Sequence, residues 1–207
     1  MIDPFLVNFI IALNFLVYIV LTLPLDLKTY FQGENINRNK QISPKTKINL
    51  WSILAFITSG LVWLIFFLDT TALFLNIRIV YNPNLIPGIL MLNIVQLLGA
   101  IFISFGTIIA VLGRYSRWDR AFSWGIPIKL ETRGMYHWIR HPLYSSYIFY
   151  FLGFPLLYLN PCFLFLLLGI LGYFSITLYE EALLVKYFPE EYPLYQKRVK
   201  RFIPFLW

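Results

Sequence analysis

Residues 134–181 read GMYHWIRHPLYSSYIFYFLGFPLLYLNPCFLFLLLGILGYFSITLYEE. The stretch has Arg140-His141-Pro142 near its start and Glu180-Glu181 at its end, with no Asp, Glu, Lys or Arg between them. Asn160-Pro161 divides it, because the residue before a proline avoids helical backbone and an Asn-Pro pair favours a turn. We therefore expect an antiparallel helical hairpin that returns Glu180-Glu181 to the side from which Arg140 enters.

The apolar segments have the length of membrane spans. A helix crosses the apolar core of a bilayer with about 20 residues, within a range of roughly 17–25. Working outward from the hairpin, the candidate segments are Leu143–Leu159, Cys162–Tyr179, Phe5–Leu25, Ile48–Leu68 and Leu85–Leu112. The sequence therefore predicts an all-α integral membrane protein with about five transmembrane helices, followed by short C-terminal helices.

The composition agrees with this fold class. Hydrophobic residues make up 59% of the chain and charged residues only 13%, whereas soluble domains average about 25% charged residues. No long polar region separates the apolar segments, so residues 1–207 are expected to form a single membrane domain. The net charge of +7 does not predict a nucleic-acid partner, because the basic residues fill short gaps between apolar runs, as they do beside membranes.

The distribution of basic residues predicts the orientation. Except for Arg78, every Lys and Arg lies in residues 26–47, in residues 113–141 or in the tail after Glu181. In a five-span arrangement these three regions share one side of the membrane. Basic loops remain in the cytoplasm, so we expect the N-terminus outside and the C-terminus in the cytoplasm.

Two further patterns predict packing. Gly99, Gly106 and Gly113 recur every seven residues on one helix face, and such small residues allow helices to approach closely in lipid. In the tail, the stripe of Tyr192, Tyr195 and Val199 predicts the packing face of a short helix that covers the cytoplasmic surface like a lid.

Chemistry is most plausible where the hairpin begins and ends. Pro142 suits the first turn of a helix, whose free N–H groups, together with Arg140 and His141, can receive an anion or the edge of an adenine ring. Adjacent helical residues face different directions, so one of Glu180 and Glu181 can face the bundle while the other faces solvent. The structural alternatives are an arginine that reaches toward lipid headgroups and an ordinary charged helix end.

Other kinds of site find little support in the sequence. No nucleophile elbow and no glycine-rich phosphate loop is present. The two histidines, His137 and His141, do not have metal-ligand spacing, and Cys162 is the single cysteine. We therefore expect no metal site.

The C-terminal half resembles the isoprenylcysteine carboxyl methyltransferase family, and the resemblance extends to phospholipid N-methyltransferases. The motifs are Gly134-x-Tyr136-x-x-x-Arg140-His141-Pro142-x-Tyr144, Glu180-Glu181-x-x-Leu184, and Phe188-x-Glu190-Glu191-Tyr192-x-x-Tyr195 followed by Pro204. They lie within about the last 95 residues. The resemblance implies that residues 113–207 form the core of a membrane methyltransferase that uses S-adenosylmethionine.

The resemblance also implies a set of cofactor-binding residues. These are Ile128, Lys129, Leu130, Glu131, Tyr136, His141, Pro142, Leu143, Tyr144, Glu180 and Glu181, of which Ile128–Glu131 has a strand-like pattern. Glu180 matches the glutamate that holds the cofactor, plausibly through its ammonium group, which a carboxylate attracts strongly in a desolvated pocket.

The methyl acceptor is less clearly indicated. Carboxyl methyltransferases of this family carry an arginine four residues before that glutamate, and this chain has Ile176 there. Arg140 or Arg201 could supply the missing charge, so both are candidate catalytic residues. The resemblance implies a lipophilic acceptor at the cytoplasmic face of the membrane, either an isoprenylcysteine carboxylate or a lipid-like amine.

Two other functions remain open from the sequence. One is an NADPH-dependent reductase resembling the sterol reductases, which share an Arg-His-Pro-x-Tyr-like element. The acidic pair Glu180-Glu181 would repel the 2′-phosphate of NADPH. The other is a non-catalytic membrane scaffold, which would bind no cofactor.

Overall fold

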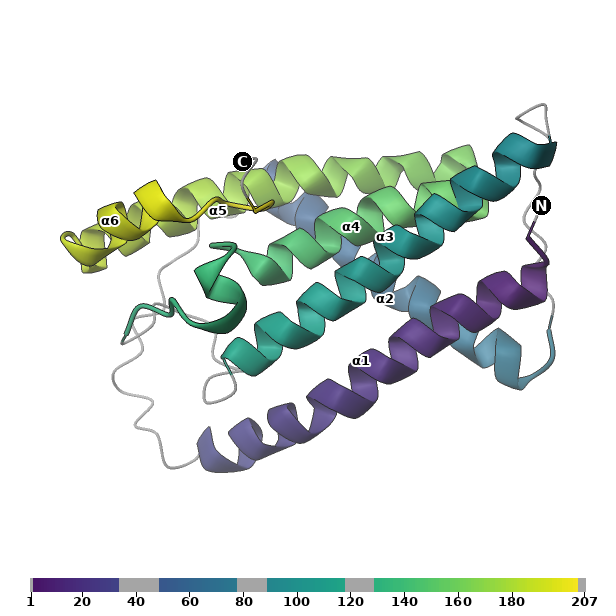
Figure 1. Cartoon of the computed structure of the whole chain (residues 1–207), viewed down its shortest axis with the longest axis horizontal. Helices are drawn as coiled ribbons and strands as arrows, with labels where there is room; N and C mark the ends of the chain where they lie inside the picture. Colours follow the sequence, from purple (N-terminus) through teal and green to yellow (C-terminus); the bar gives the residue numbers. More distant parts are fainter. Residues whose placement is uncertain (1, 34–48, 78–88, 118–128, 205–207) are drawn as a thin grey trace.

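The computed structural model describes residues 2–33, 49–77, 89–117 and 129–204 (Figure 1). The described chain is helical, and its one β-type contact is an isolated bridge between Ile139 and Lys200. The elements are α1 (Pro4–Gly33), α2 (Leu50–Phe74), α3 (Ile89–Ser116), the 3-10 helix η2 (Gly134–His137), α4 (Pro142–Tyr158), the 3-10 helix η3 (Pro161–Leu167), α5 (Leu168–Tyr187) and α6 (Glu191–Arg198). The predicted all-α fold is confirmed.

Four segments are long and apolar enough to cross a membrane: Pro4–Lys28, Leu50–Phe74, Leu92–Ser116 and Pro161–Tyr187. The remaining expected span is α4, which has 17 residues. At 1.5 Å per residue α4 is about 25 Å long, shorter than the roughly 30 Å core of a bilayer. The described residues therefore contain four candidate spans where about five were expected.

Four helices end later than the sequence predicted: α1 at Gly33, α2 at Phe74, α3 at Ser116 and α5 at Tyr187. Helix α2 continues past Leu68 to Phe74, and its buried Asp69 accepts a hydrogen bond from the hydroxyl of Tyr158 at 2.5 Å. Helix α5 continues past Tyr179 to Tyr187 and carries Glu180 and Glu181 within it. It ends where Pro189 disfavours helical backbone at the preceding residue.

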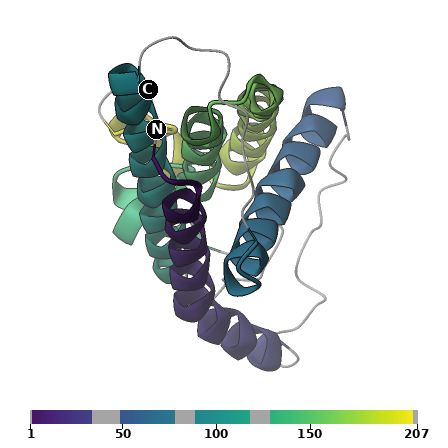
Figure 2. The ribbon, with the colours of Figure 1, turned by 90° about the vertical axis from the view of Figure 1, so that its right-hand side faces the viewer.

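Helix α4 lies between α3 and α5, and α1 and α2 complete the bundle (Figure 2). The predicted glycine stripe is confirmed as the seam between α3 and α4. A Cβ atom added to Gly99 would lie 2.5 Å from the backbone nitrogen of Leu157, and one added to Gly106 would lie 2.9 Å from the ring of Tyr150. Gln96, also on α3, donates to the carbonyl of Leu157 at 3.0 Å.

One end of the bundle gathers the C-terminal ends of α1, α3 and α5, the start of α4, and α6 (Figure 1). The predicted tail helix is present as α6, and its predicted packing face is confirmed, because Tyr192, Tyr195 and Val199 are buried together. Of the strand-like Ile128–Glu131, Ile128 lies outside the described residues. Residues 129–131 form no strand.

Candidate functional site

The loop that leads into α4 begins with a backbone turn that requires glycine. Gly134 has a positive φ of 56°, which L-residues with a Cβ atom rarely adopt. Space is also short, because a Cβ atom there would lie 2.3 Å from Oγ of Ser116. That hydroxyl accepts a hydrogen bond from the backbone N–H of Met135 at 2.8 Å. The loop is thereby fixed to the end of α3.

The C-terminal tail runs alongside this loop as a strap of residues 199–202. The backbone N–H groups of Arg140 and His141 donate to the carbonyls of Lys200 and Arg201, at 2.9 and 3.1 Å. The hydroxyl of Ser145 donates to the carbonyl of Phe202 at 2.8 Å. No local pattern in the sequence indicates this pairing, which joins segments about 60 positions apart.

Glu181 is the hydrogen-bonding centre of the site. Its carboxylate accepts from Nε of Arg140 at 2.9 Å, Nη2 of Arg201 at 2.7 Å and Nε2 of Gln196 at 3.1 Å. Nε2 of His141 lies 3.0 Å away. An ionised carboxylate only accepts hydrogen bonds, so that imidazole nitrogen carries the proton. The Glu181 side chain is 6% exposed, so it is a buried anion whose oxygens are already engaged.

Arg140 joins three elements. It enters from the start of α4, pairs with Glu181 on α5, and donates from Nη1 to the carbonyls of Gln196 and Val199 at the end of α6, at 3.2 and 2.5 Å. A cation at the C-terminus of a helix also interacts favourably with the helix dipole. Both predicted catalytic arginines, Arg140 and Arg201, are therefore held by Glu181.

Glu180 differs sharply from its neighbour. Its side chain is 40% exposed, and its Oε1 accepts a hydrogen bond from the hydroxyl of Tyr144 at 2.6 Å. Its Oε2 lies 3.6 Å from Nδ1 of His141, too far for a hydrogen bond. The two carboxylates point in different directions, as expected for adjacent helical residues. Glu180 is the one that retains room for a cationic group.

Stacked rings hold the groups beside Glu180 in place. His141 stacks on Tyr144, with ring centroids 5.7 Å apart, and Tyr144 stacks on Tyr173 at 4.7 Å. The hydroxyl of Tyr173 is 2.6 Å from Oγ of Ser59, which links the stack to α2. Pro142 and Leu143 lie against Gly113 of α3. A Cβ atom added to Gly113 would be 3.4 Å from the Pro142 side chain and 3.2 Å from the Leu143 side chain.

The remaining predicted cofactor residues that the structure describes are Tyr136, which lies in η2, and Lys129, Leu130 and Glu131, which precede η2. Burial raises the pKa of the Tyr136 hydroxyl, and the positive charge of Arg117 offsets this only in part. Tyr195 donates to the carbonyl of Tyr136 at 2.5 Å. Leu130 packs against the buried face of α6, whereas Glu131 accepts from the N–H of Arg133. Sequence reasoning did not select Arg117.

The hydroxyl of Tyr192 is a further polar group at the site. Tyr192 is 1% exposed, and its hydroxyl has no hydrogen-bond partner within the described residues. Burial raises the pKa of this hydroxyl, with a further contribution from the negative charge of Glu181. Buried polar groups are normally satisfied, so this hydroxyl is an exception among the polar groups of the site.

The sequence predicted that the protein has no metal site and that Ile176 replaces the arginine of the carboxyl methyltransferases. Within residues 2–33, 49–77, 89–117 and 129–204, no group of three or more His, Cys, Asp or Glu side chains is placed to hold a metal ion. Ile176, which stands at the position of the family's arginine, is partly buried and packs against the apolar core of the bundle. The guanidinium group of Arg201 lies over the ring of Phe174, two residues earlier on α5.

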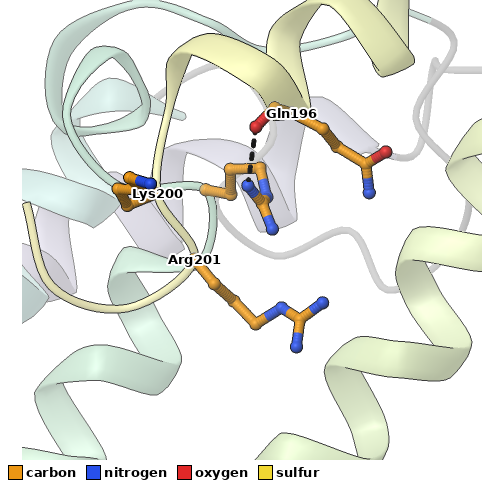
Figure 3. A pocket seen from close by; sticks show the side chains of 4 residues that line it. Gln196, Lys200 and Arg201 are labelled. Carbon is orange, nitrogen blue, oxygen red and sulfur yellow. Dashed lines mark hydrogen bonds between the residues drawn. The ribbon is translucent and has the colours of Figure 1, made fainter. Parts of the chain in front are cut away.

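A pocket is formed where α6 and the strap meet, and Figure 3 labels its lining residues Gln196, Lys200 and Arg201. It has a volume of about 240 Å³ and is lined by Arg140, Gln196, Lys200 and Arg201. Its donors come from the start of α4, from α6 and from the strap. The pocket is therefore cationic, and it is built from segments that meet only in the folded protein.

Comparisons with known proteins point to the same region. Residues 94–191 match the family described as Phospholipid methyltransferase. The protein-S-isoprenylcysteine O-methyltransferase of Saccharomyces cerevisiae is 32% identical over 115 residues, which cover 49% of this chain and 48% of the yeast protein. The Homo sapiens and Tribolium castaneum proteins of that name are 37% and 34% identical over 79 residues, 28% of their lengths.

The chain thus spans about half or less of the length of these relatives, and no solved structure matches it. The matched region contains most of α3, the hairpin and Glu180-Glu181, whereas Gln196, Arg201 and the strap lie beyond it. The predicted resemblance is confirmed. Over its matched region the chain is distantly homologous to the membrane methyltransferases that include the phospholipid and isoprenylcysteine enzymes.

Proposed function

We propose that this protein transfers a methyl group from S-adenosylmethionine to a lipophilic acceptor in the bilayer, at the cytoplasmic face of the membrane. The observation that supports this most is the division between the two carboxylates. Glu181 is buried and saturated by donors, whereas Glu180 is 40% exposed and oriented by Tyr144. A site in which one carboxylate is partly exposed and is not saturated by hydrogen-bond donors suits a ligand that carries a cation.

The residues present fit the methyl donor. Its amino-acid head carries an ammonium group, which Glu180 would bind, and its carboxylate and adenosine offer acceptors for the buried hydroxyl of Tyr192. Glu181 has no such room, so we assign it a positioning role: it fixes Arg140, His141 and Arg201. When bound, the donor supplies a methyl group on a sulfonium that is already activated for displacement.

The protein's own task is then mainly alignment. The stack of His141, Tyr144 and Tyr173 provides a rigid wall, and holding reactants in line lowers the barrier to methyl transfer. A carboxylate acceptor needs no base. An amine acceptor must also lose a proton, and we assign no base to that step, because Glu180 accepts from Tyr144 and would bind the ammonium group of the donor.

The apolar surroundings of the site favour a lipophilic methyl acceptor. The bundle is apolar, and Ile176 presents a hydrocarbon side chain toward its core. We therefore retain two acceptors, an isoprenylcysteine carboxylate and a lipid-like amine. The sequence around Glu180 favours the amine, while Arg140 and Arg201 could contact a carboxylate.

We also propose the orientation of the molecule. Arg114, Arg140, Lys186 and the basic residues of α6 and the strap lie at the end of the bundle that carries the site. Basic segments remain on the cytoplasmic side, which places the site there. Helix α4 would act as a fifth, short span, shielded from lipid by α3 and α5.

A binding experiment separates this function from its alternatives. The full-length protein in detergent is heated with S-adenosylhomocysteine or with NADPH, and the unfolding midpoint is recorded. We expect stabilisation by S-adenosylhomocysteine alone. Stabilisation by NADPH alone would indicate a reductase, and no effect of either would indicate a scaffold. Incubation with a lipid extract and a labelled methyl donor then identifies the acceptor.

A further inference from the structure

Lys200 lies between two pockets on the outer side of the strap. The first, about 240 Å³, is lined by Arg140, Gln196, Lys200 and Arg201 (Figure 3). The second, about 190 Å³, is lined by His137, Trp138, Arg198, Lys200 and Pro204. We call the residues that line these two pockets the Lys200 surface. Neither Glu180 nor Glu181 lines either pocket.

The Lys200 surface combines a fixed wall with open donors. Arg140 is immobilised, since Nε and Nη2 bind Glu181 and Nη1 binds two carbonyls. Arg201 binds Glu181 through Nε and Nη2 and lies over the ring of Phe174, and its Nη1 makes no hydrogen bond within the part of the chain that the structure describes. The Lys200 ammonium likewise has no partner among the described residues. These donors face the first pocket.

The charges in this pocket do not balance. Arg140, Lys200 and Arg201 each carry a positive charge, and Glu181 is the carboxylate paired with the two arginines. The guanidinium groups are poorly hydrated, because the Arg140 and Arg201 side chains are only 9% and 20% exposed. Such a site favours an anion, and guanidinium and ammonium donors together suit phosphate oxygens.

The second pocket indicates where that anion comes from. Trp138 is 53% exposed and lines this pocket together with Lys200 and Pro204. Exposed tryptophan beside basic residues is typical of the membrane–water interface, where the ring lies at headgroup depth. Leu194 on α6 adds an exposed apolar side chain at the same end of the molecule. These features favour a lipid phosphate over a free anion in solution.

We propose that the Lys200 surface binds the headgroup phosphate of an anionic phospholipid. Lys200 and Arg201 contact the phosphate, Arg140 fixes the pocket wall, and Trp138 lies against the glycerol region. This inference does not depend on the methyl donor. It predicts that the strap, and with it α6, is held against the membrane by a specific lipid contact.

The test is a titration of the full-length protein in detergent with short-chain phosphatidylglycerol or phosphatidylcholine, with bound lipid counted by native mass spectrometry. We expect phosphatidylglycerol to bind more tightly. Lys200→Gln should weaken its binding about fivefold, the usual effect of one basic residue at an anionic surface. Lys197→Gln is the matched control, because Lys197 is exposed on α6 and lines neither pocket. The affinity of this variant for phosphatidylglycerol should be unchanged.

Three results would overturn the proposal. Equal weakening by both lysine substitutions would show a diffuse charge effect without a site. Equal binding of the two lipids would show that the phosphate diester shared by both, and not the anionic headgroup, is recognised. Displacement of phosphatidylglycerol by inorganic phosphate at the same concentration would identify a free-anion site. Binding of S-adenosylhomocysteine should be unaffected by Lys200→Gln, which separates this test from that of the proposed function.

Discussion

At the scale of single residues, two adjacent glutamates have different roles. Glu181 binds Arg140, Arg201, His141 and Gln196 and is buried, whereas Glu180 binds Tyr144 and stays partly exposed. The difference arises from helix geometry, because neighbouring residues on α5 project about 100° apart. One carboxylate stabilises the site, and the other remains available to a ligand.

Removing the charge of Glu181 should therefore cost far more stability than removing that of Glu180. Glu181→Gln leaves two partly buried guanidinium groups without their anion, and breaking such a buried pair costs about 3–5 kcal/mol. Glu180→Gln should cost less than about 1 kcal/mol, because that carboxylate is partly exposed. The free energy of unfolding in detergent measures both. Equal losses would refute the distinction between them.

At the scale of elements, α4 depends on close contact with α3. The glycines of α3 place the two backbones together, and Gly153 of α4 lies in the same seam: a Cβ atom there would be 3.0 Å from the carbonyl oxygen of Gly99. Small residues of this kind allow tight packing in lipid. Since α4 carries Tyr144 at its start, the seam also fixes the position of the site.

A bulky residue in this seam should destabilise the bundle. Gly99→Leu forces atoms toward the Leu157 backbone, which cannot move aside as a side chain would, and overpacking costs about 1–3 kcal/mol or more. Gly60→Leu is the control, since a Cβ atom at Gly60 on α2 meets nothing within 4 Å. The thermal midpoint in detergent should fall for Gly99→Leu only. A similar fall in both variants would mean that α3 and α4 are not closely packed.

At the scale of the whole molecule, the proposed orientation places the two ends of α5 on opposite sides of the membrane. Cys162 is exposed at the start of η3, and the site lies at the far end of α5. In intact cells, a membrane-impermeant maleimide should label Cys162. In a Cys162→Ser background, Lys197→Cys should be labelled only after the membrane is opened. The reverse pattern would place the site outside the cell.

The sequence predicted the parts of the molecule that depend on local pattern. The hairpin brought Arg140 and Glu180 to one end, and the glycine spacing indicated a helix seam. What it missed depends on distant contacts. Nothing near Ile139 indicates its pairing with Lys200, and hydrophobic spacing does not say that Glu181, and not Glu180, faces the arginines. The sequence also did not indicate how deeply α4 is buried, because that burial depends on its packing against other helices.

The central claim is that Glu180 holds the methyl donor. Isothermal calorimetry of S-adenosylhomocysteine binding tests it with the unaltered protein, Glu180→Gln and the control Glu190→Gln, whose carboxylate is exposed at the start of α6. Loss of a charge-assisted hydrogen bond of about 2 kcal/mol predicts roughly 30-fold weaker binding to Glu180→Gln, in a protein that remains folded. Glu190→Gln should bind normally. Undiminished affinity in Glu180→Gln would contradict the account.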